Sequence, residues 1–283
     1  MKKIQWLSVL NLLALIIQIT LSYGTQLHWL SAKDVGQVSD QYHSLFTPSG
    51  ITFAIWGIIY LALLISCIYH MVMAFRHNQQ VSANKDIEKI GGWFILNNLG
   101  AAAWLLVWTN EMIGFSLVLI FFQLLTLIVI HANVGIYHPA RSWADAVFTQ
   151  FPLSIYIAWI SIASIANTAI YLVSINWTAF GISAIMWTVI MIAVAVLLTM
   201  LMVTARRNAF YGLVVMWALY GIFIKLRDED AQQYTMIINA ALAGIGITGI
   251  VTLMQFISNA KWSSKIRLHP GSATFPVAHH SLK

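Results

Sequence analysis

Long apolar runs, separated by short polar turns, constrain the fold of this chain more than any other feature. About 20 residues of helix cross the hydrocarbon core of a bilayer, where a helix pairs its own backbone N–H and C=O groups. Of the 283 residues, 60% are hydrophobic and 8% are charged, whereas a typical soluble domain carries about 25% charged residues. These features predict an all-α, polytopic membrane helix bundle. Eight spans are predicted, at Ile4–Tyr23, Ile51–Phe75, Ile90–Thr109, Met112–Gly135, Ala144–Val173, Ala179–Ala205, Phe210–Ile224 and Tyr234–Ile257.

The distribution of Lys and Arg predicts how these spans are oriented. If the N-terminus is cytoplasmic, twelve of the 15 basic residues fall in cytoplasmic segments and three fall outside. Cytoplasmic loops carry the excess of Lys and Arg in membrane proteins. We therefore expect an integral plasma membrane protein with both termini in the cytoplasm. The first span also has an alternative reading as a cleaved signal peptide, although its end, 21–24, lacks the usual small-residue cleavage pattern.

Acidic residues and cysteine are scarce, which limits the chemistry of the chain. The nine Asp and Glu residues lie in loops, in turns or at a helix start, although an ion-coupled carrier usually places a carboxylate within a span. The single cysteine, Cys67, excludes an intrachain disulfide and a cysteine-based metal site. We find no motif for a catalytic nucleophile, a phosphate loop or a metal. No catalytic residue and no metal ligand is therefore expected, and the scattered basic residues do not indicate nucleic-acid binding.

Aromatic rings and amides share faces on three neighbouring predicted helices. Residues four apart in a helix lie on one face, and an Asn in hydrocarbon needs a partner inside the bundle. Together these faces predict a flat-walled pocket that binds a large, planar, mostly apolar ligand. For each residue alone, the alternative is that Trp fills space and Asn joins helices. The predicted ligand-binding residues are Trp56, Tyr60, Asn97, Asn98, Trp104, Trp108, Trp159 and Asn167.

The first loop, Gly24–Gly50, is the longest in the chain. Loops of this length often form lids or are disordered, but this one is too aromatic for simple disorder. Its end, 46–50, contains Pro48 and a glycine that set the entry to the second helix. We interpret the loop as a lid over the pocket. The predicted lid residues are Trp29, Tyr42, His43 and Phe46.

The pattern of residues in the second and fifth helices resembles the TspO/MBR family, the translocator or tryptophan-rich sensory proteins. The family pattern of Pro, seven residues, Trp, three residues, Tyr is similar to Pro48, Trp56 and Tyr60, and Trp159 and Asn167 keep the family spacing of eight. The resemblance covers about residues 1–173. It implies a five-helix bundle with a pocket that opens toward the first loop and binds tetrapyrroles or sterol-like lipids, and it adds Pro48 to the predicted ligand-binding residues.

The chain departs from the family pattern in several places. Gly50 stands where the family usually has another Trp, Pro152 lies about three residues too far from Trp159, and Ala101 stands where the family has an Asn three residues before a Trp. About 110 residues also follow the family's usual end. We therefore expect residues 1–173 to form a TspO/MBR-like unit with lid loop 24–50, residues 174–258 to add three membrane helices, and residues 259–283 to form a basic cytoplasmic tail.

Small residues in the last helix lead to a separate packing prediction. Alanine and glycine recur through 240–249, and small residues let membrane helices approach each other closely. We expect this helix to pack inside the protein and to be needed for stability. The alternative is that these residues face lipid or a dimer partner.

Three functions fit these features. The first is a sensory or regulatory membrane protein that binds a tetrapyrrole- or sterol-like ligand. The second is a transporter of small hydrophobic or amphipathic molecules, and the third is an enzyme acting on tetrapyrroles or lipids, which lacks a visible acid–base pair. No cofactor is required, and a bound porphyrin or haem would be a ligand. The expected partners are membrane lipid and a hydrophobic small molecule, with a homodimer as an open alternative.

Overall fold

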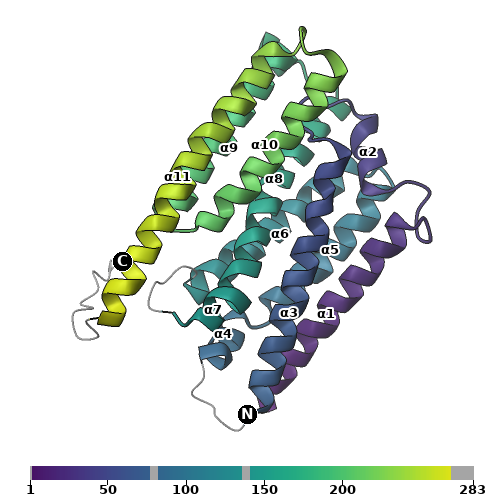
Figure 1. Cartoon of the computed structure of the whole chain (residues 1–283). Coiled ribbons are helices and arrows are strands. Elements are labelled where there is room, and N and C mark those ends of the chain that lie inside the picture. Colours follow the sequence, from purple (N-terminus) through teal and green to yellow (C-terminus); the bar gives the residue numbers. More distant parts are fainter. Residues whose placement is uncertain (1, 77–81, 136–140, 269–283) are drawn as a thin grey trace, which may run out of the picture.

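The computed structural model describes residues 2–76, 82–135 and 141–268, and within these ranges the regular structure is helical. The helices form a bundle of long, roughly aligned rods (Figure 1). The longer elements are α1 (Lys2–Gln26), α3 (Ile55–Phe75), α5 (Trp93–Thr109), α6 (Ile113–Val134), α8 (Phe151–Ser174), α9 (Ala184–Thr204), α10 (Ala209–Asp230) and α11 (Thr235–Leu268). The shorter elements are α2 (Val35–Gln41), η1 (Gly50–Ala54), α4 (Ser82–Ile90), α7 (Trp143–Asp145), η2 (Ala146–Gln150) and η3 (Ala179–Gly181).

The predicted membrane bundle is confirmed. In the described part of the chain, seven helical stretches are long and apolar enough to cross a membrane, and the bent pair α4–α5 makes an eighth if it counts as one span. Each of the eight predicted spans overlaps one of these stretches. In Figure 1, α1 begins and α11 ends at the end of the bundle opposite α2, which we call the lid side.

Several boundaries differ from the sequence prediction, most clearly those of the third span and of the last two helices. The third span bends by 53° between α4 and α5, because Gly91 adopts a left-handed backbone conformation with φ of +54° that ends α4. Helix α10 continues to Asp230, and α11 continues to Leu268. Hydropathy marks only the apolar part of a helix, whereas its backbone bonding extends into polar residues. The basic tail therefore begins as helix, and its part at 269–283 lies outside the described residues.

Helix α8 occupies the centre of the bundle. Of its most apolar window, 78% is buried, against 28% for α1 and 28% for α9. One side of α8 contacts α3 and α6, and another side contacts α10. Helix α1 packs on α3 and α5, while α9 and α11 pack on α10. The last three helices are thus joined to the first five mainly through the contact between α8 and α10, with smaller contacts between α10 and η1 and between α9 and α8.

Helix α11 packs on its neighbours through one face only. Ala241 is fully buried, and a Cβ at Gly244 would lie 3.0 Å from side-chain atoms of both Leu219 and Val196. In contrast, a Cβ at Gly246 would meet nothing within 4 Å. The 240–249 stretch therefore has an inward face and an outward face, and its importance for stability stays a prediction.

Candidate functional site

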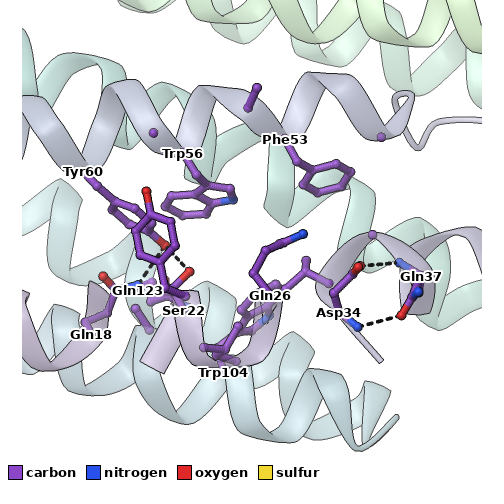
Figure 2. A pocket seen from close by; sticks show the side chains of 18 of the residues that line it. Gln18, Ser22, Gln26, Asp34, Gln37, Phe53, Trp56, Tyr60, Trp104 and Gln123 are labelled. Carbon is purple, nitrogen blue, oxygen red and sulfur yellow. Dashed lines mark hydrogen bonds between the residues drawn. The ribbon is translucent and has the colours of Figure 1, made fainter. Parts of the chain in front are cut away.

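A cavity of about 570 Å³ lies at the lid side of the bundle, and we call it the outer chamber. Its walls come from α1, α2, α5, η1 and the first turns of α3, with one residue from α6 (Figure 2). The side chains that define it are Gln18, Ser22, Tyr23, Gln26, Asp34, Val35, Gln37, Asp40, Phe53, Trp56, Tyr60, Trp104, Leu105 and Gln123.

A smaller and more apolar cavity of about 50 Å³, the inner chamber, adjoins the outer one. The two chambers share lining residues, so they form one continuous site with a wide polar part and a narrow apolar part. The shared residues are Val35, Phe53, Trp56, Trp104 and Gln123. The inner chamber adds Pro48, Trp108, Ile120, Trp159, Ile162, Asn167 and Ile170, among others.

Two stacked aromatic pairs form the walls. The rings of Trp56 and Tyr60 stack with centroids 5.1 Å apart, because the two residues are one helical turn apart on α3. Trp104 and Trp108 stack in the same way on α5, at 5.2 Å. Figure 2 shows Trp56 and Trp104 on facing sides of the outer chamber. The edge of Trp159 meets Trp56 at 6.2 Å. Such flat surfaces suit a planar apolar ligand.

Helix α1 supplies a polar edge to the outer chamber. Gln18 Nε2 donates to Tyr60 Oη at 3.0 Å, and Tyr60 Oη donates to Ser22 Oγ at 3.0 Å. These bonds hold the Tyr60 ring against Trp56. Sequence reasoning missed Gln18 and Ser22, although buried polar residues recur on this face of α1 at Ser8, Asn11 and Gln18. These buried polar residues are three and seven positions apart, and this helical spacing is the sequence signal that could have predicted a polar inward face on α1.

Hydrogen bonds fix two of the four tryptophans that line the inner chamber. Trp104 Nε1 donates to Asn167 Oδ1 at 2.9 Å, and Asn167 Nδ2 donates to Ser116 Oγ at 3.1 Å. Trp108 Nε1 donates to the backbone oxygen of Val35 at 3.1 Å. Trp159 is 3% exposed, and its indole N–H has no hydrogen-bond partner among the described residues. A buried donor without a partner costs about 1–3 kcal/mol, so the Trp159 N–H is an unused donor in the inner chamber.

The two predicted asparagines of α5 lie outside both chambers. Asn97 Nδ2 donates to Gln123 O at 3.0 Å and to Thr126 Oγ1 at 2.8 Å, which ties α5 to α6. Asn98 Nδ2 donates to Phe94 O within its own helix, at 2.8 Å. Their geometry is that of the helix-joining alternative. The amide at the α5–α6 contact that lines both chambers is Gln123, which the sequence analysis did not select.

The lid contains a short helix, and its polar face lines the outer chamber. Asp34 caps α2 with a capping box, because Gln37 N donates to Asp34 Oδ1 at 2.9 Å and Asp34 N donates to Gln37 Oε1 at 3.0 Å. This Asp-x-x-Gln signature was readable in the sequence but was not used. The chamber-lining residues of the lid are Asp34, Val35, Gly36, Gln37 and Asp40.

None of the four predicted lid residues is among the residues described as lining either chamber. Trp29 is 76% exposed, whereas Phe46 is fully buried in the core. Tyr42 packs on the cluster around Trp108, and His43 lines a separate surface cavity. The aromatic content of the loop therefore reflects how the loop packs, while three of the five lid residues that line the outer chamber, Asp34, Gln37 and Asp40, are polar.

The lid helix is attached to the turn between α5 and α6. Lys33 Nζ pairs with Glu111, and Gln41 Nε2 donates to Glu111 Oε2 at 3.0 Å. The hydrogen bond from Lys33 lowers the pKa of the Glu111 carboxyl below its usual value. Val38 at the centre of α2 is fully buried beside Trp108. These contacts fix one side of α2 over the chambers.

Helix α10 attaches the loop end that leads into α3. Ser49 N donates to Gly221 O at 3.1 Å, and Trp217 Nε1 donates to Thr52 O at 2.9 Å. A Cβ at Gly221 would lie 2.1 Å from Thr52 Oγ1 and 2.8 Å from Pro48 Cβ, so this approach requires glycine. Pro48 lines the inner chamber. The last three helices therefore help to shape the site.

The described lining combines aromatic contact surface with a few hydrogen-bonding groups. Among the described residues, no group of three or more His, Cys, Asp or Glu side chains could hold a metal ion. No His, Cys or Met is among the described residues of either chamber. Phe53, Trp56 and Trp104 provide contact surface, while Gln18, Ser22 and Gln123 provide hydrogen-bonding groups.

The fold and the site define a polytopic helical membrane protein with an aromatic pocket under a helical lid. The model of the family described as TSPO-like protein matches residues 8–254. Because this match covers most of the chain, the protein belongs to the TSPO-like family. The matched stretch runs past residue 173 and includes α9 and α10. Comparison with curated proteins and comparison with solved structures each found no match.

Proposed function

We propose that this protein is a sensory or regulatory membrane protein that binds a large, planar, hydrophobic molecule, tetrapyrrole- or sterol-like, in the two chambers. The observation that carries the proposal is the pair of facing rings Trp56 and Trp104 in the wall of a cavity of about 570 Å³. Each of these rings is stacked on a second one, Tyr60 in the same cavity and Trp108 in the inner chamber. Pockets of about 300–1,000 Å³ bury drug-sized ligands. The TSPO-like family membership supports the same reading.

In this proposal the ligand body lies between the aromatic walls, and its polar groups meet the amides and hydroxyls of α1 and α6. The protein needs no cofactor, and a porphyrin would be a ligand. The charge distribution supports a place in the plasma membrane with both termini cytoplasmic, which puts the lid side outside the cell. Whether the protein forms a homodimer in the membrane can be read from its mass in a lipid nanodisc.

A titration with an uncharged planar ligand tests the proposal. Protoporphyrin dimethyl ester is added to the full chain in nanodiscs, and quenching of tryptophan fluorescence is followed. We expect saturable quenching, with an affinity about tenfold weaker in Trp56→Ala, because a central aromatic contact contributes about 1–3 kcal/mol. Trp143→Ala is the matched control, since Trp143 is 70% exposed and is not described as lining either chamber.

Two results would contradict the proposal. One is the absence of saturable quenching by this ester and by a fluorescent sterol in the wild-type protein. The other is an unchanged affinity in Trp56→Ala, provided that its melting temperature shows it to be folded. In either case the aromatic walls would be packing elements.

A transporter remains the second candidate, and one observation favours it. A cavity of about 20 Å³ toward the opposite end of the bundle is lined by Ser8, Asn11, Ser66 and His70, among others. Asn11 lines this small cavity and Gln18 lines the outer chamber. The two residues share one face of α1, two turns or about 10 Å apart, and the fully buried Leu15 lies between them. The two cavities are therefore separated by a short stretch of α1. Uptake of an amphipathic molecule into proteoliposomes, with and without a proton gradient, separates this candidate from a binding protein.

A further inference from the structure

The charges around the outer chamber have one sign. Asp34 and Asp40 are its charged lining residues, and among the described residues no Lys, Arg or His lines either chamber. Figure 2 places Asp34 beside Gln37 at one end of the chamber, with Tyr60, Gln18 and Ser22 at the other end. The aromatic walls lie between these two ends.

The neighbouring cations have other partners. Lys33 Nζ, adjacent in sequence to Asp34, pairs with Glu111 and with Gln41 Oε1 at 2.7 Å. Lys225 Nζ donates to Ser44 O at 3.4 Å and lines a separate surface cavity, of which Asp40 is also a wall residue. Lys225 therefore lies on the side of Asp40 that faces away from the outer chamber, and it only partly offsets the negative charge of Asp40 within the chamber. Asp34 has no such neighbour facing the chamber.

The carboxylate of Asp34 has free hydrogen-bonding capacity. Its Oδ1 accepts from Gln37 N at 2.9 Å, and Oδ2 has no hydrogen-bond partner among the described residues. A carboxylate accepts up to about four hydrogen bonds, and those from a charged donor are stronger than neutral ones. Asp34 is thus positioned to accept from a ligand while it also caps α2.

The aromatic walls reinforce this preference. The faces of Trp and Tyr rings carry negative potential and attract cations within about 6 Å of the ring centre. The stacked pair Trp56–Tyr60 borders the same chamber as Asp34. The inner chamber presents the unpaired N–H of Trp159, a neutral donor that suits an uncharged acceptor on the buried part of a ligand.

Resting on the function proposed above, we propose that the site selects by charge and binds planar hydrophobic ligands that carry a protonated nitrogen near Asp34. The ring system lies between Trp56 and Trp104, and the cationic group points toward the lid helix. A free carboxylate at the same place would face Asp34 and Asp40 with no described cation in the lining to balance it. Neutral molecules bind with intermediate affinity, so esterified porphyrins bind more tightly than their free acids.

Three probes with the same ring system and different head groups test this. Pyrenemethylamine, pyrenemethanol and pyrene carboxylate are titrated into the protein in zwitterionic nanodiscs, with empty nanodiscs as the blank for membrane partitioning. We expect the protonated amine to bind about tenfold more tightly than the carboxylate, with the alcohol between them, because each interaction with a partly exposed charge changes affinity by about two- to fivefold. Added salt should narrow this spread.

Two variants test whether Asp34 and Asp40 cause the selection between charged ligands. Asp34→Asn removes the charge and keeps the cap, since Asn and Asp cap helices equally well, and Asp34→Asn combined with Asp40→Asn removes both charges. The three affinities should converge in the double variant, with little change for the alcohol. Asp228→Asn is the matched control, because its side chain is 66% exposed, pairs with Arg227 and is not described as lining either chamber. It should keep the wild-type order.

The outcomes separate this inference from the proposed function. If all three probes bind with equal affinity, if the carboxylate binds best, or if the double variant keeps the wild-type spread, charge selection by these aspartates is overturned while the binding function stands. If none of the three probes and no uncharged porphyrin gives saturable binding, the proposed function fails, and the inference fails with it.

Discussion

Replacing Gly221 by alanine should push α10 away from the binding site. The new Cβ would lie 2.1 Å from Thr52 Oγ1, 2.8 Å from Pro48 Cβ and 3.0 Å from Thr52 Cβ. Thr52 is 1% exposed, so its side chain has little free space for rotation. The Pro48 ring has no alternative rotamer, and it moves only with its backbone. The helix and the loop end must therefore separate, and the bonds from Ser49 and Trp217 lengthen.

The cost follows from this geometry. Inserting a methyl group into a packed contact costs about 1–3 kcal/mol, while replacing glycine by alanine within a helix contributes up to about 1 kcal/mol of stabilisation. Gly246→Ala is the matched control, because it has the same helix term and no atom within 4 Å of the new Cβ. The difference between the two variants therefore isolates the steric cost at about 1–3 kcal/mol.

Apparent melting temperatures in detergent should show this difference. We expect Gly221→Ala to melt on the order of 5 °C below Gly246→Ala, since about 1 kcal/mol corresponds to a few degrees in a chain of this size. The affinity for protoporphyrin dimethyl ester should also fall in Gly221→Ala, because Pro48 lines the inner chamber. If Gly221→Ala melts at or above the temperature of Gly246→Ala and keeps the wild-type affinity, the argument that α10 shapes the site is wrong.

Two further predictions concern the lid and the inner chamber. The lowered pKa of Glu111 means that its contribution to lid attachment is present at neutral pH and is lost as the pH falls through the folded-state pKa, below the usual carboxyl range of about 4. The protection of α2 amides, taken as their exchange rate relative to the intrinsic rate at the same pH, should therefore fall at low pH, and Glu111→Gln should accelerate exchange at pH 7. An unchanged exchange rate in Glu111→Gln would remove Lys33 and Glu111 as the lid attachment. Trp104→Phe removes the 2.9 Å bond to Asn167, so it should lower stability by about 1 kcal/mol and weaken porphyrin binding, as judged by melting and by quenching. A variant that binds as tightly as the wild type would show that Trp104 does not contact the ligand.

The membrane spans could be predicted because bilayer thickness imposes a long and strong hydropathy signal. The bend at Gly91 could not be predicted, because the sequence alone does not distinguish a glycine in the left-handed conformation from a glycine within a straight helix. Helix α1 shows a different limit. Its hydropathy fitted both a retained span and a signal peptide, and hydropathy alone gives no sign that Gln18 and Ser22 line the outer chamber.

The candidate site was predictable where ring spacing alone decides the geometry. Trp56 and Tyr60 share a face and line the outer chamber because they are one turn apart. Asn97 and Asn98 occupy faces that only the packing of α5 against its neighbours determines, and both bond within the bundle. In the lid, aromatic residues were predicted to face the pocket, but Phe46 is buried in the core while the polar Asp34 lines the chamber. Burial in the core and exposure to a cavity both favour aromatic side chains, so residue type alone does not separate them.

The uneven attachment of the lid helix has a kinetic consequence. Glu111 and Trp108 hold α2 on the α5 side, and Gly221 of α10 holds the loop that follows. Among the described residues, no hydrogen bond joins α1 to α2, although Gln26 and Gln37 both border the outer chamber. If a ligand binds as proposed, we therefore expect it to leave between these two helices. Its residence time should depend on the last turn of α1, and a cross-link from that turn to α2 should slow release and uptake to the same degree and leave the equilibrium affinity unchanged.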